Sequence, residues 1–451
     1  MDAFRYLIVV LSMVFMTLLI ANTALFNFTV ICMEPLDTVG VVGNRTHRFS
    51  TYEEGWILSM VSIGAFTGMY PAIFITNVIG LRQSFTIFGI MSAISTLLVP
   101  IASSSFYWVM VTRFIQVSWS FAVEGFSLAL AHLACGAVPV SWGGANARGL
   151  FVSIMCTSYQ LGPFMAMWNA GYFCTSPYGW QSVYYLYGIL TFLVATLFFV
   201  IYSNSPEKNR HVSINKAVPL PTKKHVVPYA RMAKSRSVWG ILASGLASSI
   251  AYDTFILYGP ICLNTALKLE IPQTGLLASL PYLISMFSKI LAGIYLDKVR
   301  CASEHVRCLS FTAVFQLAMA STFIAMTLIS AEITFIPVAL FTITMVFSCI
   351  YHVGLMNASQ VVAQQYTHIL TSVLAAQNCL GGFVLPPIIA FFVPHYSKSE
   401  WSTVFYGIAT LLFITTIIFV MLTKVKPASW TKSELKKDGT NNKEQVTLSS
   451  V

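Results

Sequence analysis

Apolar segments of about 20 residues, separated by short polar connections, follow one another along nearly the whole chain. A helix of that length crosses the roughly 30 Å of hydrocarbon in a bilayer. The pattern therefore predicts an all-α membrane protein with twelve transmembrane helices. The predicted segments are residues 6–29, 56–79, 84–104, 107–135, 150–172, 182–202, 238–262, 275–296, 308–330, 335–355, 369–393 and 402–422.

The longest polar connection, from Ser203 to Arg236, separates the first six segments from the last six. A six-plus-six arrangement is typical of transporters built from two repeats around a central site. We expect an N-terminal six-helix bundle at 1–203, a cytoplasmic basic linker at 204–236, a C-terminal six-helix bundle at 237–424 and a cytoplasmic polar tail at 425–451. The composition of the tail predicts disorder.

The composition identifies the class of protein. Hydrophobic residues make up 56% of the chain and charged residues only 9%, whereas a soluble domain has about 25% charged residues. The sequence contains no phosphate-binding P-loop, no H-E-x-x-H and no G-x-S-x-G motif. We therefore expect an integral membrane protein that is not an enzyme and has no cofactor, and any transport must draw on an ion or solute gradient.

Basic residues lie almost entirely on one side of the predicted helices. With a cytoplasmic N-terminus, 20 of the 26 Lys and Arg fall on the inner side, 4 on the outer side and 2 within segments. This asymmetry predicts that both termini are cytoplasmic. Basic loops beside anionic inner-leaflet lipids also account for the net charge of +10, so no nucleic-acid partner is expected.

The outer loops carry two further features. Asn44 begins an N-x-T pattern in the loop before the second segment, so a glycan is expected there. Cys32, Cys174 and Cys262 also lie toward the outer side. The sequence leaves open whether two of these three cysteines form a disulfide.

Arg113 and Glu124 lie within the fourth segment, whose other residues suit lipid. A charge at membrane depth costs about 2.5 to 3.5 kcal/mol and normally marks a functional path. The two residues are 11 positions apart, about three helical turns, so they share one helix face. We predict that Arg113 contacts a substrate anion and that Glu124 is the protonatable coupling residue. The alternative is a structural ion pair with neighbouring helices, or Arg113 reaching toward the interface.

Asp253 in the seventh segment and Lys289 in the eighth are the other intramembrane charges. An ion pair between them would neutralise both. In the alternative interpretation, Asp253 carries the coupling proton or sodium ion and Lys289 contacts the anion, because a buried carboxylate readily changes its protonation state. Tyr252, beside Asp253, is one of the tyrosines that the sequence places at a cavity as a substrate contact.

Motifs in three places carry a family resemblance. They are Glu54-Gly55-Trp56-Ile57-Leu58-Ser59 before the second segment, Gly179-Trp180 with Val183-Tyr184-Tyr185 at the sixth, and the run from Gly275 to Leu283 with Gly293 and Asp297 at the eighth. They resemble the anion/cation symporter branch of the major facilitator superfamily, which includes sialin, the vesicular glutamate transporters and the type I sodium-phosphate cotransporters. The overall pattern is most similar to the divergent nematode members.

The resemblance implies two rocking six-helix bundles that move organic or inorganic anions by alternating access, coupled to protons, sodium or membrane potential. In this family an arginine and a following glutamate of the fourth span serve anion recognition and proton coupling. Arg113-x-x-Gln116 matches the arginine end and Glu124 resembles the glutamate end. Because the separation is longer than in the family, Ser120 is the alternative occupant of the acidic position. Asn357 also belongs to the resemblance and is expected to contact substrate.

The predicted function is therefore ion-coupled transport of a small anionic solute across a lipid bilayer. The competing interpretation is a non-transporting receptor or scaffold on the same fold. The carboxyl end, Ser449-Ser450-Val451, fits the pattern that adds a strand to a PDZ domain. The sequence does not distinguish the plasma membrane from a vesicular or lysosomal membrane.

Overall fold

The computed structural model describes residues 2–33, 49–115, 138, 142, 151, 153–203, 228–266, 269–298, 303–328 and 335–431. Within these ranges every regular element is helical. Each of the twelve predicted segments contains a helix in its described part, so the predicted all-α membrane fold is confirmed. Nine of the helices are long and apolar enough over their described residues to cross a membrane.

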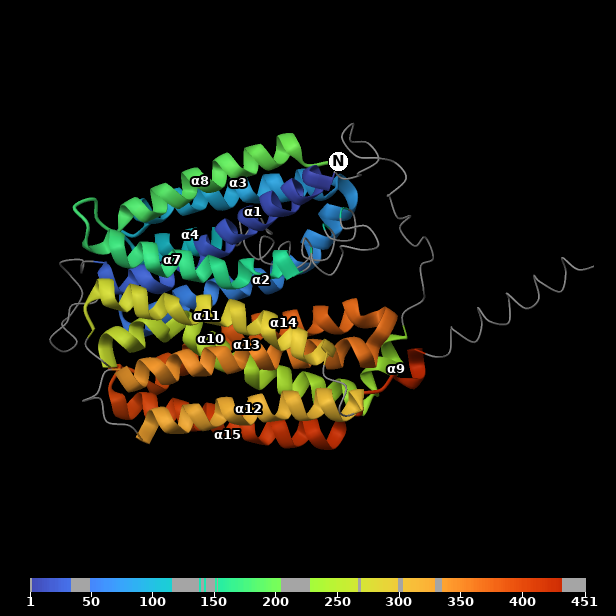
Figure 1. Cartoon of the computed structure of the whole chain (residues 1–451). Coiled ribbons are helices and arrows are strands. Elements are labelled where there is room, and N and C mark those ends of the chain that lie inside the picture. Colours follow the sequence, from blue (N-terminus) through green and yellow to red (C-terminus); the bar gives the residue numbers. More distant parts are fainter. Residues whose placement is uncertain are drawn as a thin grey trace, which may run out of the picture.

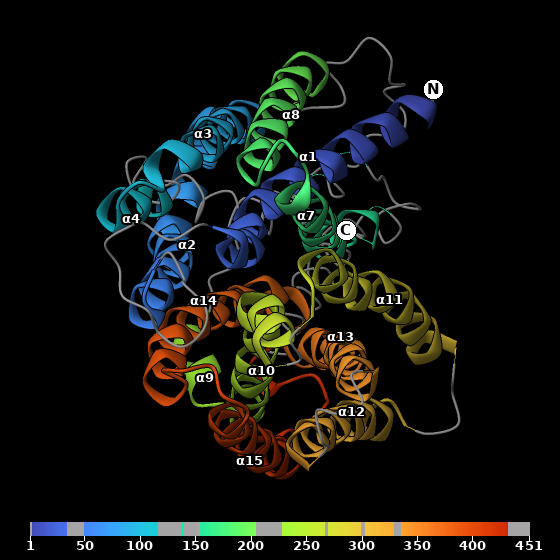
Figure 2. The ribbon, with the colours of Figure 1, turned by 90° about the vertical axis from the view of Figure 1, so that its left-hand side faces the viewer.

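The helices of the N-terminal half form one bundle, drawn in blue to green in Figure 1. They are α1 Asp2–Thr29, α2 Thr51–Ile79, α3 Leu81–Ala102, α4 Phe106–Ile115, α7 Ser158–Thr175 and α8 Gln181–Ile201. A short 3-10 turn, Val30–Cys32, follows α1. In the view along the helices, α1 lies between α7 and α8, and α3 lies against α8 (Figure 2).

The helices of the C-terminal half form the second bundle, from yellow-green to red in Figure 1. They are α10 Arg236–Ala266, α11 Ile271–Lys298, α12 Glu304–Leu328, α13 Phe335–Ala363, α14 Thr367–Phe392 and α15 Lys398–Leu422. The short α9, Tyr229–Ala233, precedes α10, and a 3-10 turn, Gln364–Tyr366, joins α13 to α14. The bundles meet along two lines, where α7 faces α11 and α2 faces α14 (Figure 2).

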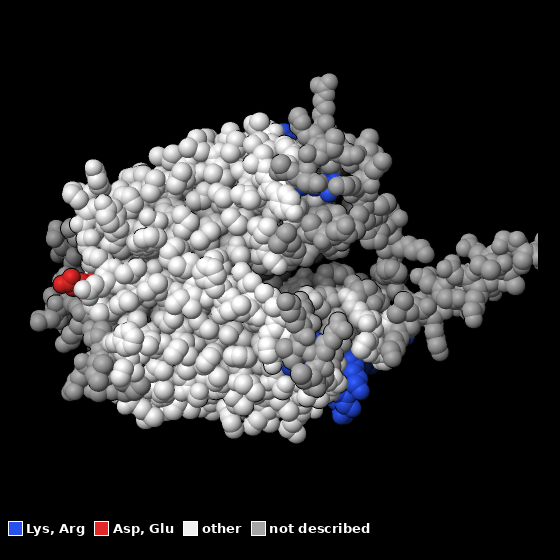
Figure 3. Space-filling view, in the orientation of Figure 1, with Lys and Arg blue, Asp and Glu red and all other residues white. Residues whose placement is uncertain are grey.

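The two ends of the molecule differ in charge. We call the end that holds the start of α1 the basic end, and Figure 3 shows Lys and Arg gathered there. The opposite end, here the far end, holds the starts of α2, α11 and α15 with their glutamates. The described basic-end cations are Arg5, Arg82, Arg231, Lys234, Arg236, Arg307, Lys424 and Lys426.

Local sequence sets where two far-end helices begin. The Ser50 hydroxyl accepts a hydrogen bond from the Glu53 amide (3.3 Å), and the Glu53 carboxylate accepts one from the Ser50 amide (2.9 Å). Ser397 and Glu400 form the same capping box at the start of α15. Such boxes satisfy amides that have no partner within the helix. At the basic end, Gly80 adopts φ 86° between α2 and α3, a conformation that glycine adopts at little cost.

Buried apolar side chains form one cluster across both bundles in the far half, and separate clusters in the basic half. Members of the shared cluster are Phe26 and Phe28 of α1, Ala170 of α7, Phe255 and Tyr258 of α10, Ala278 of α11 and Leu385 of α14. The basic half of the first bundle packs around Phe15, Phe85 and Phe198. That of the second packs around Ile241 and Tyr351. Among the described residues, the bundles therefore share a core in the far half alone.

Each bundle also contains a buried polar network. In the first, the Asn22 amide donates to Ser92 (3.3 Å) and Thr191 (3.0 Å), joining α1, α3 and α8. In the second, the Ser244 hydroxyl donates to Gln316 (2.7 Å), and the Gln316 amide donates to Thr415 (3.1 Å). This network joins α10, α12 and α15. Both networks join the first, third and sixth helices of their halves. These bonds hold each bundle together internally.

The structure settles two points that the sequence left open or missed. Cys32 and Cys174 form a disulfide, with Cα atoms 5.9 Å apart, while Cys262 is free. The predicted disorder of the tail is wrong for residues 425–431, because Val425 and Trp430 are buried against the second bundle. The polar composition of the whole tail masked these two apolar anchors.

Candidate functional site

Glycines bring the two bundles into backbone contact at the far end. A methyl group added at Gly275 of α11 would lie 2.7 Å from the Cα of Gly171 in α7, so the two helices touch without side chains between them. On the other line of contact, a methyl group added at Gly55 of α2 would lie 3.1 Å from the carbonyl oxygen of Pro386 in α14. Larger residues at these positions would separate the bundles.

Hydrogen bonds cross between the bundles in the same half. The Asn27 amide of α1 donates to the carbonyl of Ile256 in α10 (3.1 Å). The Ser59 hydroxyl of α2 donates to the carbonyl of Phe383 in α14 (3.0 Å). Each acceptor is a main-chain carbonyl inside a helix and not an atom of a flexible side chain. The two bonds therefore fix the distance between the helices.

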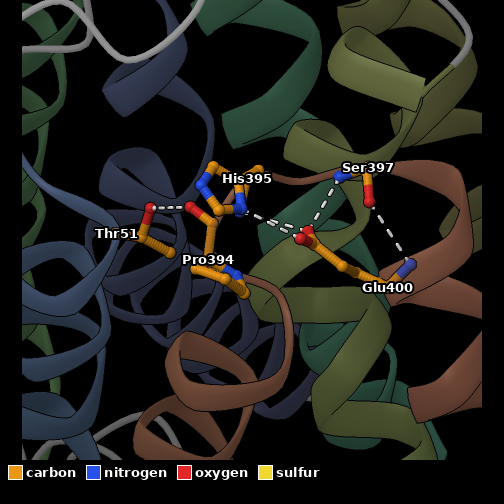
Figure 4. Close-up of polar contacts among 5 residues, drawn as sticks. All are labelled: Thr51, Pro394, His395, Ser397 and Glu400. Carbon is orange, nitrogen blue, oxygen red and sulfur yellow. Dashed lines mark hydrogen bonds and ion pairs between the residues drawn. The ribbon is translucent and has the colours of Figure 1, made fainter.

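The loop after α14 also joins the two bundles at the far end. The Thr51 hydroxyl donates to the Pro394 carbonyl at 2.9 Å (Figure 4), and the Tyr396 hydroxyl donates to the buried Glu54 carboxylate at 2.6 Å. Burial, together with the neighbouring Glu54 charge, raises the pKa of Tyr396 well above its usual value. Tyr396 therefore remains a neutral donor at any physiological pH.

The basic end is arranged differently. There each bundle has its own core, and the space-filling view shows a hollow between the two halves at the end where Lys and Arg gather (Figure 3). Among the described residues, the structure is therefore closed at the far end and open at the basic end.

Asp253 lies near the middle of α10 and is 7% exposed. Its Oδ2 atom has no hydrogen-bond partner among the described residues. The carboxylate lies against two glycines of α14, because methyl groups added at Gly381 and Gly382 would be 3.5 and 3.6 Å from Oδ2. Ser62 of α2 approaches Gly382 from the other bundle. The carboxylate thus lies beside the line along which the bundles meet.

Lys289 of α11 is half-buried and shares a helix face with Ser285 and Tyr282, which precede it by four and seven residues. Its amine lies within electrostatic range of Cys349 on α13. Cys349 also interacts with Ser285 and accepts a hydrogen bond from the Gln160 amide of α7 at 3.8 Å. Three helices from two bundles therefore bring a cation, an amide, a hydroxyl and a thiol together.

The structure distinguishes between the two interpretations of the intramembrane charges. Asp253 and Lys289 are both described, and no ion pair within 4.0 Å joins them. The interpretation in which they neutralise each other is therefore wrong for this conformation. Tyr252 is half-buried beside Asp253. Asn357 is half-buried too, but lies about 12 Å along α13 from Cys349 toward the basic end.

The roles of all the sequence-predicted site residues stay predictions, and for four of them the structure describes no side-chain contacts either. Arg113 falls in α4, but its side chain lies outside the described part of the structure. Gln116, Glu124 and Asn44 lie wholly outside the described ranges. Their contacts with substrate, coupling ion or glycan are therefore expectations from the sequence alone.

Sequence reasoning missed the neutral members of the site. Ser285 carried a usable signal, because it precedes Lys289 by one helical turn and must share its face. Gln160, Cys349 and Ser62 carried none, since an uncharged polar residue within an apolar segment is common. Only the packing of α7 and α13 against α11, and of α2 against α14, brings them to the charges.

The chemistry available is binding and proton transfer. Lys289 can hold an anion, because no described residue forms an ion pair with it. The Asp253 carboxylate can take up and release a cation. Asp253 lies about midway along α10, and Lys289 lies about two-thirds of the way along α11 toward the basic end.

Comparison with known proteins agrees with this architecture. Residues 7–384 match the Major Facilitator Superfamily. Sodium-dependent phosphate transport protein 1 of Oryctolagus cuniculus is 24% identical over 407 residues, which cover 87% of this chain and 84% of that protein. Sialin of Homo sapiens is 25% identical over 413 residues, covering 88% and 81%. The resemblance to the anion/cation symporter branch is thus confirmed.

Solved structures share the fold at low identity. The D-xylose-proton symporter superposes with a TM-score of 0.68 at 15% identity, covering 93% of this chain and 98% of that one. A bacterial homologue of the lysosomal transporter Spinster, inward-facing and occupied, gives 0.66 at 12% identity, covering 93% and 95%. With the family match and the transporter relatives, these likenesses show that the chain is a multi-pass membrane transporter of the Major Facilitator Superfamily.

Proposed function

We propose that the protein is a secondary active transporter that moves a small organic or inorganic anion by alternating access, coupled to a proton or sodium gradient. The carrying observation is that Lys289 and Asp253 lie well inside their helices, beside the contact between the bundles, without neutralising each other. An unpaired cation suits an anionic solute, and a separate unpaired carboxylate suits a coupling ion. Relatives named for phosphate and urate support an anion as the solute.

Each site residue has a proposed role. Lys289 is the anion contact, with Tyr252 at the cavity wall and Asn357 on the path toward the basic end. Arg113 and Gln116 are proposed to contact the same anion from α4 and the residues after it. Asp253 and Glu124 are proposed to carry the coupling ion. We also propose that the basic end is cytoplasmic, which follows from the excess of Lys and Arg there.

The uptake of labelled phosphate, urate, sialate, glutamate and aromatic carboxylates into proteoliposomes tests this proposal. Proton, sodium and voltage gradients are imposed one at a time. We expect uphill accumulation of one anion under one gradient, and a loss of at least about tenfold in Lys289→Ala, the size expected for losing a charge-assisted contact. Lys234→Ala removes a basic-end cation away from the site and is the matched control.

Two outcomes would contradict the proposal. Wild-type accumulation by folded Lys289→Ala protein would remove Lys289 from the anion site. No flux of any anion under any gradient, from protein shown to be folded and inserted, would favour a receptor or scaffold on the same fold.

A further inference from the structure

We infer that Asp253, the Gly381–Gly382 pair of α14 and Ser62 of α2 form the binding site of the coupling proton, and that protonation of Asp253 allows the far end to close. The inference rests on the proposed function, because it assumes an ion-coupled transporter. It names the ion and assigns it to one conformational step. The juxtaposition that carries it is a buried carboxylate at the contact between helices of different bundles.

The glycine pair creates the recess. Asp253 Oδ2 lies 3.5 and 3.6 Å from where methyl groups at Gly381 and Gly382 would be, which is ordinary van der Waals distance. A methyl group at Gly382 would also collide with Ser62 Oγ and lie 3.2 Å from Ser62 Cβ. Gly382 thus contacts the Asp253 carboxylate and the neighbouring bundle at once. Any approach of α2 to α14 changes the surroundings of Asp253.

The recess offers the carboxylate nothing that would compensate its charge. The titratable groups that face it are Tyr252 on its own helix, Tyr282 of α11 and Cys379 of α14. None of these is a cation, and no described Lys or Arg pairs with Asp253. An ionised carboxylate buried without a partner is strongly disfavoured. The closed far end therefore favours Asp253 in its protonated form.

The surroundings favour a proton over sodium. Hard metal cations take about six oxygen ligands in proteins. The described side chains at the recess that carry a carboxylate or hydroxyl oxygen are Asp253, Ser62 and Ser249, and the glycines have no side-chain oxygen. Three such side chains are fewer than a metal cation of this kind requires. A proton needs one oxygen alone, since it forms a single covalent O–H bond with Oδ.

The resulting step is simple. With the far end open, water reaches Asp253 and the carboxylate is ionised. A proton taken up from that side forms the O–H bond, removes the charge and allows α2 to pack against α14. The proton then leaves to water at the basic end, and the uncompensated charge that this restores on Asp253 favours reopening of the far end. One proton therefore crosses with each closure of the far end.

Spin labels test this step without any substrate. A ketone-bearing amino acid replaces Tyr178 and Ser399, which are exposed at the far end of the two bundles, and the label distance is measured in lipid nanodiscs from acid to alkaline pH. We expect a short distance at acid pH and a growing longer population as pH rises, with the closed-to-open ratio changing by up to about tenfold per pH unit. Asp253→Asn, which is permanently neutral, should keep the short distance at every pH.

A glycine series tests the packing step. Gly382→Ala should populate the longer distance even at acid pH, because its methyl group collides with Ser62. Adding Ser62→Gly should restore the short distance, which also shows that the single variant is folded. Gly407→Ala of α15, where nothing lies within 4 Å of the added methyl group, is the matched control and should behave as wild type.

Several results would overturn the inference. Wild-type pH dependence in Asp253→Asn would exclude Asp253 as the proton site. A sodium-dependent shift at fixed pH that Asp253→Asn abolishes would assign sodium instead. A Gly382→Ala protein that matches Gly407→Ala would exclude the packing step. Anion uptake with a pH-insensitive far end refutes this inference alone, whereas a pH-sensitive far end without anion uptake refutes the proposed function alone.

Discussion

The far half and the basic half of the molecule are held together in different ways. In the far half, apolar packing, glycine contacts and hydrogen bonds run from one bundle into the other. In the basic half, each bundle packs around its own apolar cluster. The far half is therefore a contact between two bodies, while the basic half consists of two separate bodies.

The difference shows which contacts alternating access must break. Opening the far end separates helices that touch at glycines, share an apolar cluster and are joined by hydrogen bonds to main-chain carbonyls. The polar networks inside the bundles need not change, because Asn22 and Gln316 each join helices of a single bundle. Changes at the contact should therefore alter the balance of conformations, and changes inside a bundle should alter its stability.

The largest effect is expected where the backbones touch. In Gly275→Ala the methyl group would lie 2.7 Å from Gly171 Cα, and a main chain has little freedom to yield. Overpacking of this kind costs about 2 kcal/mol, which is roughly a thirtyfold shift of the conformational balance toward the open far end. The far-end label distance at acid pH measures it directly.

Gly293→Ala is the control on the same helix, since nothing lies within 4 Å of its added methyl group. Both substitutions change helix propensity equally, so their difference isolates the contact with α7. A Gly275→Ala protein with the same distance distribution as Gly293→Ala would show that the glycine contact does not determine closure.

A smaller effect of a different kind is expected inside the second bundle. Gln316→Leu removes the hydrogen bonds to Ser244 and Thr415. Ser244 keeps Tyr351 as a partner at 2.6 Å, and Thr415 keeps its bond to the Leu411 carbonyl. The cost should therefore be about 1 kcal/mol, within the range found for polar contacts between membrane helices. Thermal unfolding in detergent measures it.

The far-end label distance should stay unchanged in Gln316→Leu, in contrast to Gly275→Ala. Thr410→Val is a suitable control, because Thr410 is exposed on α15 and bonds to its own helix. A shift of the label distance in Gln316→Leu without loss of thermal stability would contradict the division into rigid bundles and a separable contact.

Hydrophobicity predicted the helices well because the bilayer imposes it locally. The segment predicted at 182–202 corresponds to α8, Gln181–Ile201. The prediction fails where a helix leaves the hydrocarbon. The tenth segment was predicted to end at 355, but α13 continues to Ala363. Polar and small residues can extend a helix beyond its apolar part, because the main-chain hydrogen bonds of the helix do not depend on hydrophobicity. Hydropathy marks the membrane-buried part of a helix rather than its end.

The site was predictable only where a residue is costly by itself. Asp253 and Lys289 can be identified from the sequence alone, because a charge in an apolar membrane segment is costly and usually has a function. Gln160 and Cys349 carry no such cost, and their contact joins residues that are 189 positions apart in the sequence. The Cys32–Cys174 pairing was likewise one of three open choices until α1 and α7 were seen side by side.

The smallest effect concerns the loop that joins α14 to α15. Slight burial by itself would raise the pKa of Glu400, but hydrogen bonds from Ser397 and His395 outweigh it and lower the pKa below the usual 4.5. The stabilisation is therefore complete above the unfolded pKa and is lost as pH falls through the lower folded pKa. Glu400→Gln should reduce stability by about 0.5 kcal/mol at neutral pH, with the difference from wild type shrinking in acid. Thermal unfolding from pH 7 to 3.5 measures this, with exposed Glu270→Gln as control, and an acid-insensitive difference would show that the charge of Glu400 does not stabilise the loop.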